Sequence, residues 1–141
     1  MLQRSAGNRL FHVVVEDADV AQRCIELLTK NRSGRLTFLP LTTLRPHTVD
    51  PSKVEEFHRR EGIPAGGKNQ VLVPMVNFIT FDPAIQAAVN TVWGKTLVAK
   101  DMTVANKGAK FCDAECTTRE GTRVRELPPH CEFPPRVTVL P

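Results

Sequence analysis

A repeated order of glycine, strand, acid, helix and strand constrains the fold of this chain more than any other feature. Residues 7–10 and 94–97 each place a leucine three positions after a glycine, at the start of an apolar stretch. An acid follows each stretch, Asp17 in the first copy and Asp101 in the second, and a Val-Ala pair follows each acid. The second copy is three residues shorter before that pair. We therefore predict two related α/β units, in each of which the glycine begins a strand.

The second unit is introduced by the segment DPAIQAAVNTVWGKTLVAKD at residues 82–101. Asp82 suits a helix N-cap, and Pro83 suits the first helical position, where its missing N–H is not needed. The apolar residues after it recur at helical spacing and predict one buried face, made of Ile85, Ala88, Val89 and Val92. We predict that Gly94 ends this helix in the left-handed conformation and that residues 96–99 form a short buried strand.

The first unit is predicted to be a strand, a helix and a second strand. Residues 10–15 are almost continuously apolar and rich in valine, which is typical of a strand buried on both faces. Asp17 or Asp19 caps a helix over residues 18–30, whose apolar positions mark its core face: Ala21, Cys24, Ile25 and Leu28. Residues 36–41 form the second strand, and Pro40 places its end at a sheet edge or at an exit from the sheet.

The two units are separated by residues 42–70, which we interpret as a mobile insertion. It contains a short polar helix that begins at Asp50 and Pro51. Val54 and Phe57 are the apolar anchors of this helix, and a glycine-rich loop follows it. Such loops connect elements without forming one of their own.

The remaining predicted elements are short. Residues 71–81 predict a strand or a strand with a break, and residues 104–111 a short helical turn. A hairpin follows, with Gly121 at the left-handed position of its turn. We expect residues 1–126 to form one domain and the proline-rich residues 127–141 to form an extended or disordered tail.

The composition is that of an ordinary globular protein, with 41% hydrophobic and 24% charged residues. The net charge of +4 permits contact with nucleic acid but does not require it. No apolar run approaches the length of a membrane-spanning helix, and the N-terminus has no signal-peptide pattern. We therefore expect no membrane partner and no disulfide framework.

Two patterns are similar to metal or nucleotide sites without matching them. The first pattern consists of Cys112, Cys116, His130 and Cys131. These residues form either a zinc site or a set of reduced thiols with a nearby histidine. We favour reduced thiols, because two adjacent residues rarely reach the same metal. The second, at residues 62–69, has the glycines and lysine of a phosphate-binding loop, but Asn69 replaces the Ser or Thr that holds magnesium. None of the histidines has a recognised catalytic signature, so we predict no catalytic residue, no metal and no cofactor.

These motifs, in this order, resemble the hinge domain of the structural maintenance of chromosomes (SMC) family. The resembling segments are AGNRLFHVVVED, the helix after it, GRLTFLPL, the stretch from FDP to GKTLVAKD, and the closing turn at Glu120 and Gly121. Their order and spacing hold over residues 6–124. Within the family, NRLF, TFLPL and GKTL most resemble the third SMC subunit of eukaryotic cohesin. The resemblance implies an α+β fold of two pseudo-repeated mixed α/β subunits, with small sheets flanked by helices.

The resemblance covers only part of a hinge. In the family, a further half-unit precedes the strand that here follows Ala6, and a glycine-rich final strand stands where this sequence has LPPHCEFPP. No heptad repeat of coiled-coil arms flanks the resembling segment. We therefore expect a partial hinge over residues 1–126, which comes from a fragment or from a variant gene product.

The resemblance implies dimerisation and no catalysis. SMC hinges form ring-shaped dimers by pairing sheet edges, and nucleotide binding in the family belongs to distant head domains. The residues that we expect at the dimer interface are Gly121, Thr122, Arg123 and Val124, and a solvated surface hairpin is the alternative. The expected partner is the hinge of the first SMC subunit of cohesin, with a homodimer as the fallback. The expected location is the nucleus, on chromosomes.

Hinges of this family also bind DNA weakly through basic surface. The basic residues near the repeat glycines and strand ends are Arg4, Arg9, Lys30, Arg32, Arg35, Lys95 and Lys100. Their contacts with phosphate would not depend on sequence. The alternative is that these residues form a basic surface that contacts only solvent. Aromatic residues, on which bases could stack, make up only 6% of the chain, and tyrosine is absent. Two other classes stay open: a stand-alone basic nucleic-acid-binding protein and a small enzyme of unknown class.

Overall fold

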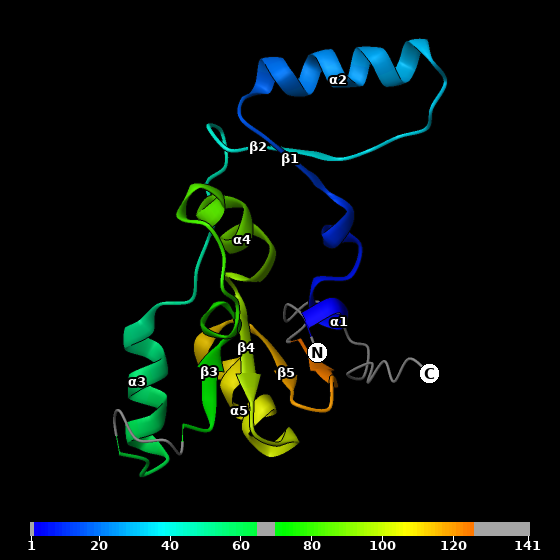
Figure 1. Ribbon diagram of the computed structural model, residues 1–141. Coiled ribbons are helices and arrows are strands. Elements are labelled where there is room, and N and C mark those ends of the chain that lie inside the picture. Colours follow the sequence, from blue (N-terminus) through cyan, green and yellow to red (C-terminus); the bar gives the residue numbers. More distant parts are fainter. Residues whose placement is uncertain (1, 65–69, 126–141) are drawn as a thin grey trace.

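The structure is a computed structural model that describes residues 2–64 and 70–125 (Figure 1). The predicted tail at residues 127–141 and most of the glycine-rich loop lie outside these ranges, as do two members of the cysteine and histidine group, His130 and Cys131. The described part contains two sheets, and each is built on a strand–helix–strand unit.

The larger sheet has four strands and forms the body of the molecule. Its strands, in spatial order, are β3 (Leu72–Pro74), β4 (Thr96–Ala99), β5 (Glu115–Thr118) and β6 (Arg123–Val124). The two central strands run parallel, and the outer strands are antiparallel to their neighbours. Every residue of β4 and β5 is buried, which agrees with the predicted buried strand at residues 96–99.

Helices cover one face of this sheet. Helix α5 (Met102–Cys112) connects β4 to β5 and packs on them, and helix α3 (Pro51–Arg60) lies against α5. Apolar side chains of both helices and of the sheet form one core: Val54, Phe57, Leu72, Leu97, Ala99, Ala105, Ala109, Cys112, Ala114 and Cys116. The two predicted anchors of α3 are thus confirmed, and so is its cap, since the carboxylate of Asp50 accepts the N–H of Ser52.

The opposite face of the sheet meets the start of the chain. Helix α1 (Leu2–Ala6) packs against helix α4 (Gln86–Trp93), and the 3-10 helix η1 (Gly7–Phe11) follows α1. Two further 3-10 helices, η2 (Met75–Phe78) and η3 (Pro83–Ile85), lead from β3 into α4. The predicted apolar face of α4 is confirmed at three of its positions, where Ala88, Val89 and Val92 are buried, whereas Ile85 is exposed.

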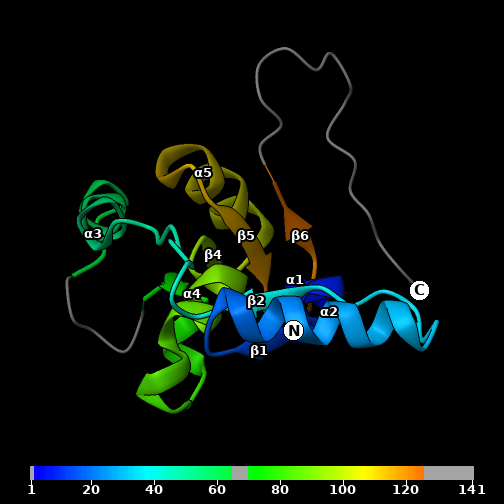
Figure 2. The same cartoon turned by 90° about the horizontal axis from the view of Figure 1, so that it is seen from above.

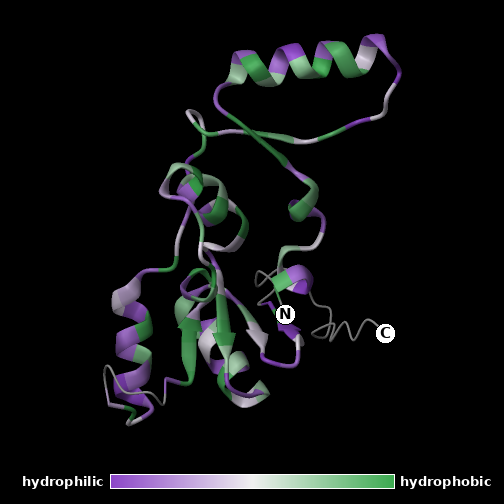
Figure 3. Cartoon of the chain, viewed as in Figure 1, coloured by the Kyte–Doolittle hydropathy of each residue, from purple (hydrophilic) through white to green (hydrophobic). Residues whose placement is uncertain are grey.

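The smaller sheet belongs to the first unit, which stands apart from the body in Figure 1 and overlaps α4 and α1 when the molecule is seen from above in Figure 2. Strands β1 (Val13–Val15) and β2 (Phe38–Pro40) pair in parallel, and helix α2 (Ala18–Lys30) packs against them. Val13 and Val14 are each 39% exposed, although Figure 3 shows that this strand is as apolar as β3 and β4. The first unit therefore exposes apolar surface that the second unit buries.

The structure confirms the repeat. The units β1–α2–β2 and β4–α5–β5 both have parallel strands joined through a helix. Asp17, and not Asp19, caps α2, and Asp101 caps α5 in the same extended conformation. Each carboxylate accepts a backbone N–H at 2.9 Å, from Val20 in the first unit and from Val104 in the second. The same order of residues thus encodes the same local structure twice.

The glycines of the repeat do not act as predicted. Gly7 has a φ of 55° and begins η1 instead of a strand, so the strand predicted over residues 10–15 is confined to β1. Gly94 has a φ of −60° and is not left-handed. A Cβ at Gly94 would overlap the carbonyl of Asn90 and lie 2.8 Å from the carbonyl oxygen of His47, so glycine is needed there for the close approach of two backbones.

Other predictions also need correction. β1 is not buried on both faces, because α2 is the one element of the described chain that packs broadly on its sheet. The predicted core face of α2 is only partly buried: Ala21 is buried and Cys24 and Leu28 are half-buried, whereas Ile25 is 49% exposed. Residues 77–81 do not continue β3, since η2 interrupts it, and the turn predicted at residues 104–111 is the full helix α5. The predicted hairpin is confirmed, with a φ of 91° at Gly121.

Candidate dimerisation edge

Strand β6 is the last strand of the larger sheet, and within residues 2–64 and 70–125 no strand pairs with its outer side. Next to it, the N–H of Thr118 donates to the carbonyl of Thr122 at 2.8 Å. Hydrogen-bonded and non-hydrogen-bonded pairs alternate along an antiparallel ladder. Arg123, opposite Thr117, therefore turns its backbone N–H and C=O outward, and Val124 turns its own toward β5. Among residues 2–64 and 70–125, the outer side of β6 therefore presents a backbone donor and acceptor that no other backbone group binds.

The other edge of the same sheet is closed by a histidine. His58 of α3 is 4% exposed, and its Nε2 accepts the N–H of Leu72 in β3 at 3.3 Å. Pro74, at the end of β3, has no N–H to offer. Burial lowers the pKa of His58 below its ordinary value of 6.5, which keeps the ring in the neutral form that can accept this bond. A strand from another chain could therefore form backbone hydrogen bonds with the outward N–H and C=O groups of β6.

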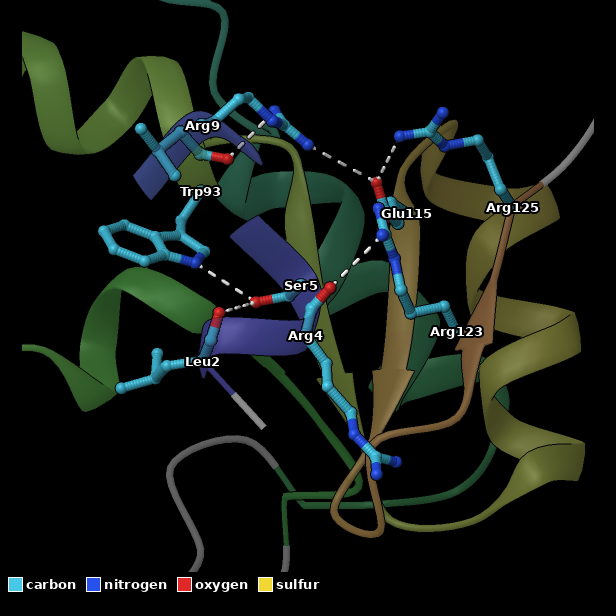
Figure 4. A network of polar contacts seen from close by, with 9 residues as sticks. Leu2, Arg4, Ser5, Arg9, Trp93, Glu115, Arg123 and Arg125 are labelled. Carbon is cyan, nitrogen blue, oxygen red and sulfur yellow. Dashed lines mark hydrogen bonds and ion pairs between the residues drawn. The ribbon is translucent and has the colours of Figure 1, made fainter. Parts of the chain in front are cut away.

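One carboxylate organises the charges beside β6. The side chain of Glu115 in β5 is only 7% exposed, and three arginines surround it (Figure 4). Arg125 lies 2.7 Å from its Oε2, Arg9 lies 3.9 Å from the same oxygen, and Arg123 pairs with its Oε1. A buried carboxylate is costly unless it is paired and hydrogen-bonded, and these arginines meet that need.

Hydrogen bonds also connect the start of the chain to the surroundings of Glu115. Arg123 donates to the carbonyl of Arg4 at 3.2 Å, and Arg9 donates to the carbonyl of Val92 at 3.1 Å. The indole N–H of Trp93 donates to the hydroxyl of Ser5 at 3.1 Å (Figure 4). These bonds hold α1 and η1 between α4 and the hairpin of β5 and β6.

The structure places the four predicted interface residues together on the hairpin. Gly121 is buried in the turn, and a Cβ there would lie 3.0 Å from the side chain of Arg4. Thr122, Arg123 and Val124 are half-buried. Arg123 and Val124 form the edge strand β6, and Gly121 and Thr122 lie in the turn before it, so their role at an interface stays a prediction.

The seven predicted DNA-contact residues fall into three groups. Arg4 and Arg9 belong to the start of the chain, where the side chain of Arg9 lies beside Glu115 and that of Arg4 lies beside Gly121 of the hairpin turn. A second group lies at the end of α2 and in the loop after it: Lys30, Arg32 and Arg35, all exposed. The third consists of Lys95 and Lys100, which flank β4 at its two ends. The seven residues that were predicted as one DNA-contact surface therefore lie on different parts of the fold.

Sequence reasoning missed Glu115 and Arg125. A usable signal was present, because the hairpin register pairs Thr117 with Arg123, and two residues further along it places Glu115 opposite Arg125. Residues directly opposite in an antiparallel pair have neighbouring side chains. The alternating arginines of RVR at residues 123–125 therefore indicated that an acid across the hairpin would be paired with them.

The described residues form no metal or nucleophile cluster. Cys112 and Cys116 are buried free thiols, and burial raises the pKa of both, that of Cys116 to about 12. Thiols held in the protonated form are poor nucleophiles and poor metal ligands. Within the described ranges, no group of three His, Cys, Asp or Glu side chains could hold a metal ion. None of the helices there has both the length and the hydropathy for crossing a bilayer.

A family model gives the deciding comparison. The model described as the flexible hinge domain of SMC proteins matches residues 2–109 of this chain. The chain belongs to the SMC hinge family. The match spans most of both repeat units, and it confirms the resemblance inferred from the glycine-started segments.

Individual relatives agree with this assignment. The chain is 36% identical over 120 residues to structural maintenance of chromosomes protein 3 of Dictyostelium discoideum, a match that covers 85% of this chain and 7% of that protein. The crystal structure of the Pyrococcus furiosus SMC hinge domain has a TM-score of 0.67 and 32% identity, over 86% of this chain and 56% of that one. The chain is thus similar to about half of a solved hinge, which agrees with a partial hinge.

A second solved structure supports the fold alone. An asymmetric dimer of the Geobacillus stearothermophilus SMC hinge domain has a TM-score of 0.71 and 24% identity, over 88% of this chain and 48% of that one. The predicted fold class is confirmed, because this chain has small sheets flanked by helices and matches both solved hinges.

Proposed function

We propose that this chain is a pairing module that joins one SMC protein to another by adding a strand to the outer side of β6. The observation that carries the proposal is the outward backbone of Arg123 on the open edge of a sheet whose other edge is closed by His58. Free strand edges bind other strands through main-chain hydrogen bonds. The proposal assigns the chain no catalytic step.

The partner that we propose is the hinge of the first SMC subunit of a cohesin-type complex. The likeness to an SMC protein 3 supports this choice, because the third and first subunits are the expected pair. The assignment to the flexible hinge domain of SMC proteins supports pairing as the general mode. The chain spans 7% of its Dictyostelium relative, so the role in chromosome organisation and the location on chromosomes in the nucleus are part of the proposal.

Weak, sequence-independent DNA contact is a secondary part of the proposal. Lys30, Arg32 and Arg35 are exposed, and the ion pairs of the described residues do not involve them. Cations in this state are available to phosphate oxygens.

Amide hydrogen exchange tests the pairing directly, because β6 carries its own control. The amide of Arg123 points outward and should exchange fast in the free chain and slowly once a first-subunit hinge is added. The amide of Val124 points to β5 and should be protected in both states. Solution mass should show a one-to-one complex under the same conditions. A complex in which the Arg123 amide still exchanges fast would place the interface elsewhere.

A further inference from the structure

The chemistry of a partner for β6 is limited by the side chains that border this edge. Side chains alternate along a strand, so Arg123 and Arg125 point to the same face of the sheet, and Glu115 shares that face across the hairpin. Arg125 is the more available of the two arginines, since its side chain is 63% exposed. Any strand that pairs with β6 must place its side chains next to these arginines.

The local charges do not balance. Glu115 supplies one negative charge, and Arg9, Arg123 and Arg125 supply three positive charges, which leaves an excess of two. Three further charged residues are exposed close by: Arg4 on α1, and Arg119 and Glu120 in the hairpin turn, which together add one more positive charge. The edge of β6 is therefore electropositive, and a neighbouring strand would experience that field at close range.

A second copy of this chain fits the edge poorly. When two identical strands pair antiparallel about a two-fold axis, residues directly opposite each other point to the same face. In the registers centred on residues 123–125, an arginine of one copy then lies opposite an arginine of the other. Like charges directly opposite destabilise a strand pair.

We infer that the strand received by β6 carries carboxylates at alternate positions and belongs to a different polypeptide, not to the β6 of a second copy. Glutamate or aspartate on the arginine face would balance the excess charge and add cross-strand ion pairs to the main-chain ladder. This inference rests on the proposed pairing at β6 and specifies the chemistry of the partner.

Three soluble ten-residue peptides test the inference. Each alternates threonine with one other residue, which is glutamate, glutamine or lysine. At low ionic strength the glutamate peptide should bind at least tenfold more tightly than the glutamine peptide, should protect the Arg123 amide from exchange, and should be weakened by salt. The lysine peptide should not bind.

A matched pair of variants locates the effect. Arg125→Gln removes a charge from the arginine face of β6, and it should reduce the affinity for the glutamate peptide severalfold. Arg119→Gln removes the same charge from the exposed turn of the same hairpin, and it should change that affinity less than twofold. Equal losses in the two variants would overturn the inference, because the attraction would then be general and not specific to the strand.

Other results separate this inference from the proposed function. Equal binding of the glutamate and glutamine peptides, no binding of the glutamate peptide, or self-association of the free chain with a protected Arg123 amide would each overturn the acidic partner. In those cases protection of Arg123 by the first-subunit hinge would leave the proposed pairing intact. If the first-subunit hinge also fails to protect the Arg123 amide, the proposed pairing at β6 and the inferred acidic partner are both wrong.

Discussion

At the residue scale, His58 links the stability of the sheet edge to its own protonation state. Its Nε2 can accept the N–H of Leu72 only when the ring is neutral, and burial already disfavours the charged form. The pKa of His58 in the folded chain is therefore below the value of about 6.5 that it takes in the unfolded chain. The unfolded chain binds more protons in the interval between these two values.

We predict that the free energy of unfolding is highest above pH 6.5 and falls as the pH drops from 6.5 toward the lowered pKa of His58. One proton sets a limit of about 1.4 kcal/mol per pH unit on the slope from this group. Urea unfolding at pH 7.5, 6.5 and 5.5 measures it. His58→Gln keeps an acceptor without titrating there, and should flatten the profile. An unchanged slope in that variant would assign the pH dependence to other groups.

Residue-scale prediction from the sequence was uneven for reasons that the structure makes clear. Val54 and Phe57 were predictable anchors because apolar spacing reports burial directly. His58 was not predictable, because the burial of a polar side chain depends on a partner that compensates for its desolvation, and that partner, the N–H of Leu72, lies on a strand beyond the intervening loop. Glu115 was missed although its partner Arg125 lies on the neighbouring strand of the same hairpin.

At the element scale, the two helix caps are a natural matched pair. Asp17 and Asp101 have the same backbone conformation and the same 2.9 Å bond to an N–H, yet α5 is packed in the core and α2 is largely exposed. Local cap chemistry is therefore equal, and the tertiary surroundings differ.

We predict that Asp101→Ala lowers the free energy of global unfolding by about 1 kcal/mol, the usual cost of losing an N-cap. Asp17→Ala should have little effect on global unfolding and should instead accelerate amide exchange within α2, because the main contacts of this helix are with β1 and β2 and not with the core of the body. Urea unfolding and hydrogen exchange on both variants make the comparison. Equal losses of global stability would show that the two units unfold as one.

The elements that sequence reasoning predicted well are those set by local chemistry. The helix starts at Asp50 and Asp82 and the glycine turn of the hairpin each depend on residues within a few positions of each other. The exposure of β1 could not be predicted, because burial depends on what packs against a strand. The right-handed conformation of Gly94 could not either, since the nearby carbonyl of His47 comes from a distant loop.

At the scale of the whole molecule, the start of the chain is docked on the body by a few polar contacts. Trp93 is the single tryptophan of the sequence, and its indole N–H donates to Ser5 of α1. Its fluorescence therefore reports whether α1 is in place. Glu115 holds Arg9 and Arg123, which flank the same docking site.

We predict that Glu115→Gln releases the start of the chain and shifts the emission of Trp93 to the red by several nanometres. The variant should also lose about 2 kcal/mol of stability, less than the 3–5 kcal/mol typical of a fully buried pair, because the arginines are partly exposed. Glu120→Gln, in the exposed turn of the same hairpin, is the matched control and should leave the emission unchanged. An identical spectrum for Glu115→Gln would mean that α1 stays docked without the carboxylate.

The position of Glu115 also determines how the domain would respond to mechanical load. Its carboxylate ties Arg9, near the start of the chain, to Arg123 and Arg125, near the end of the described part. A pulling force applied between residues 2 and 125 would strain these ionic contacts together with the short pairing of β6, before it reached the buried strands β4 and β5. Because ionic contacts weaken as salt rises, the domain would be stiffer in dilute buffer than in concentrated salt.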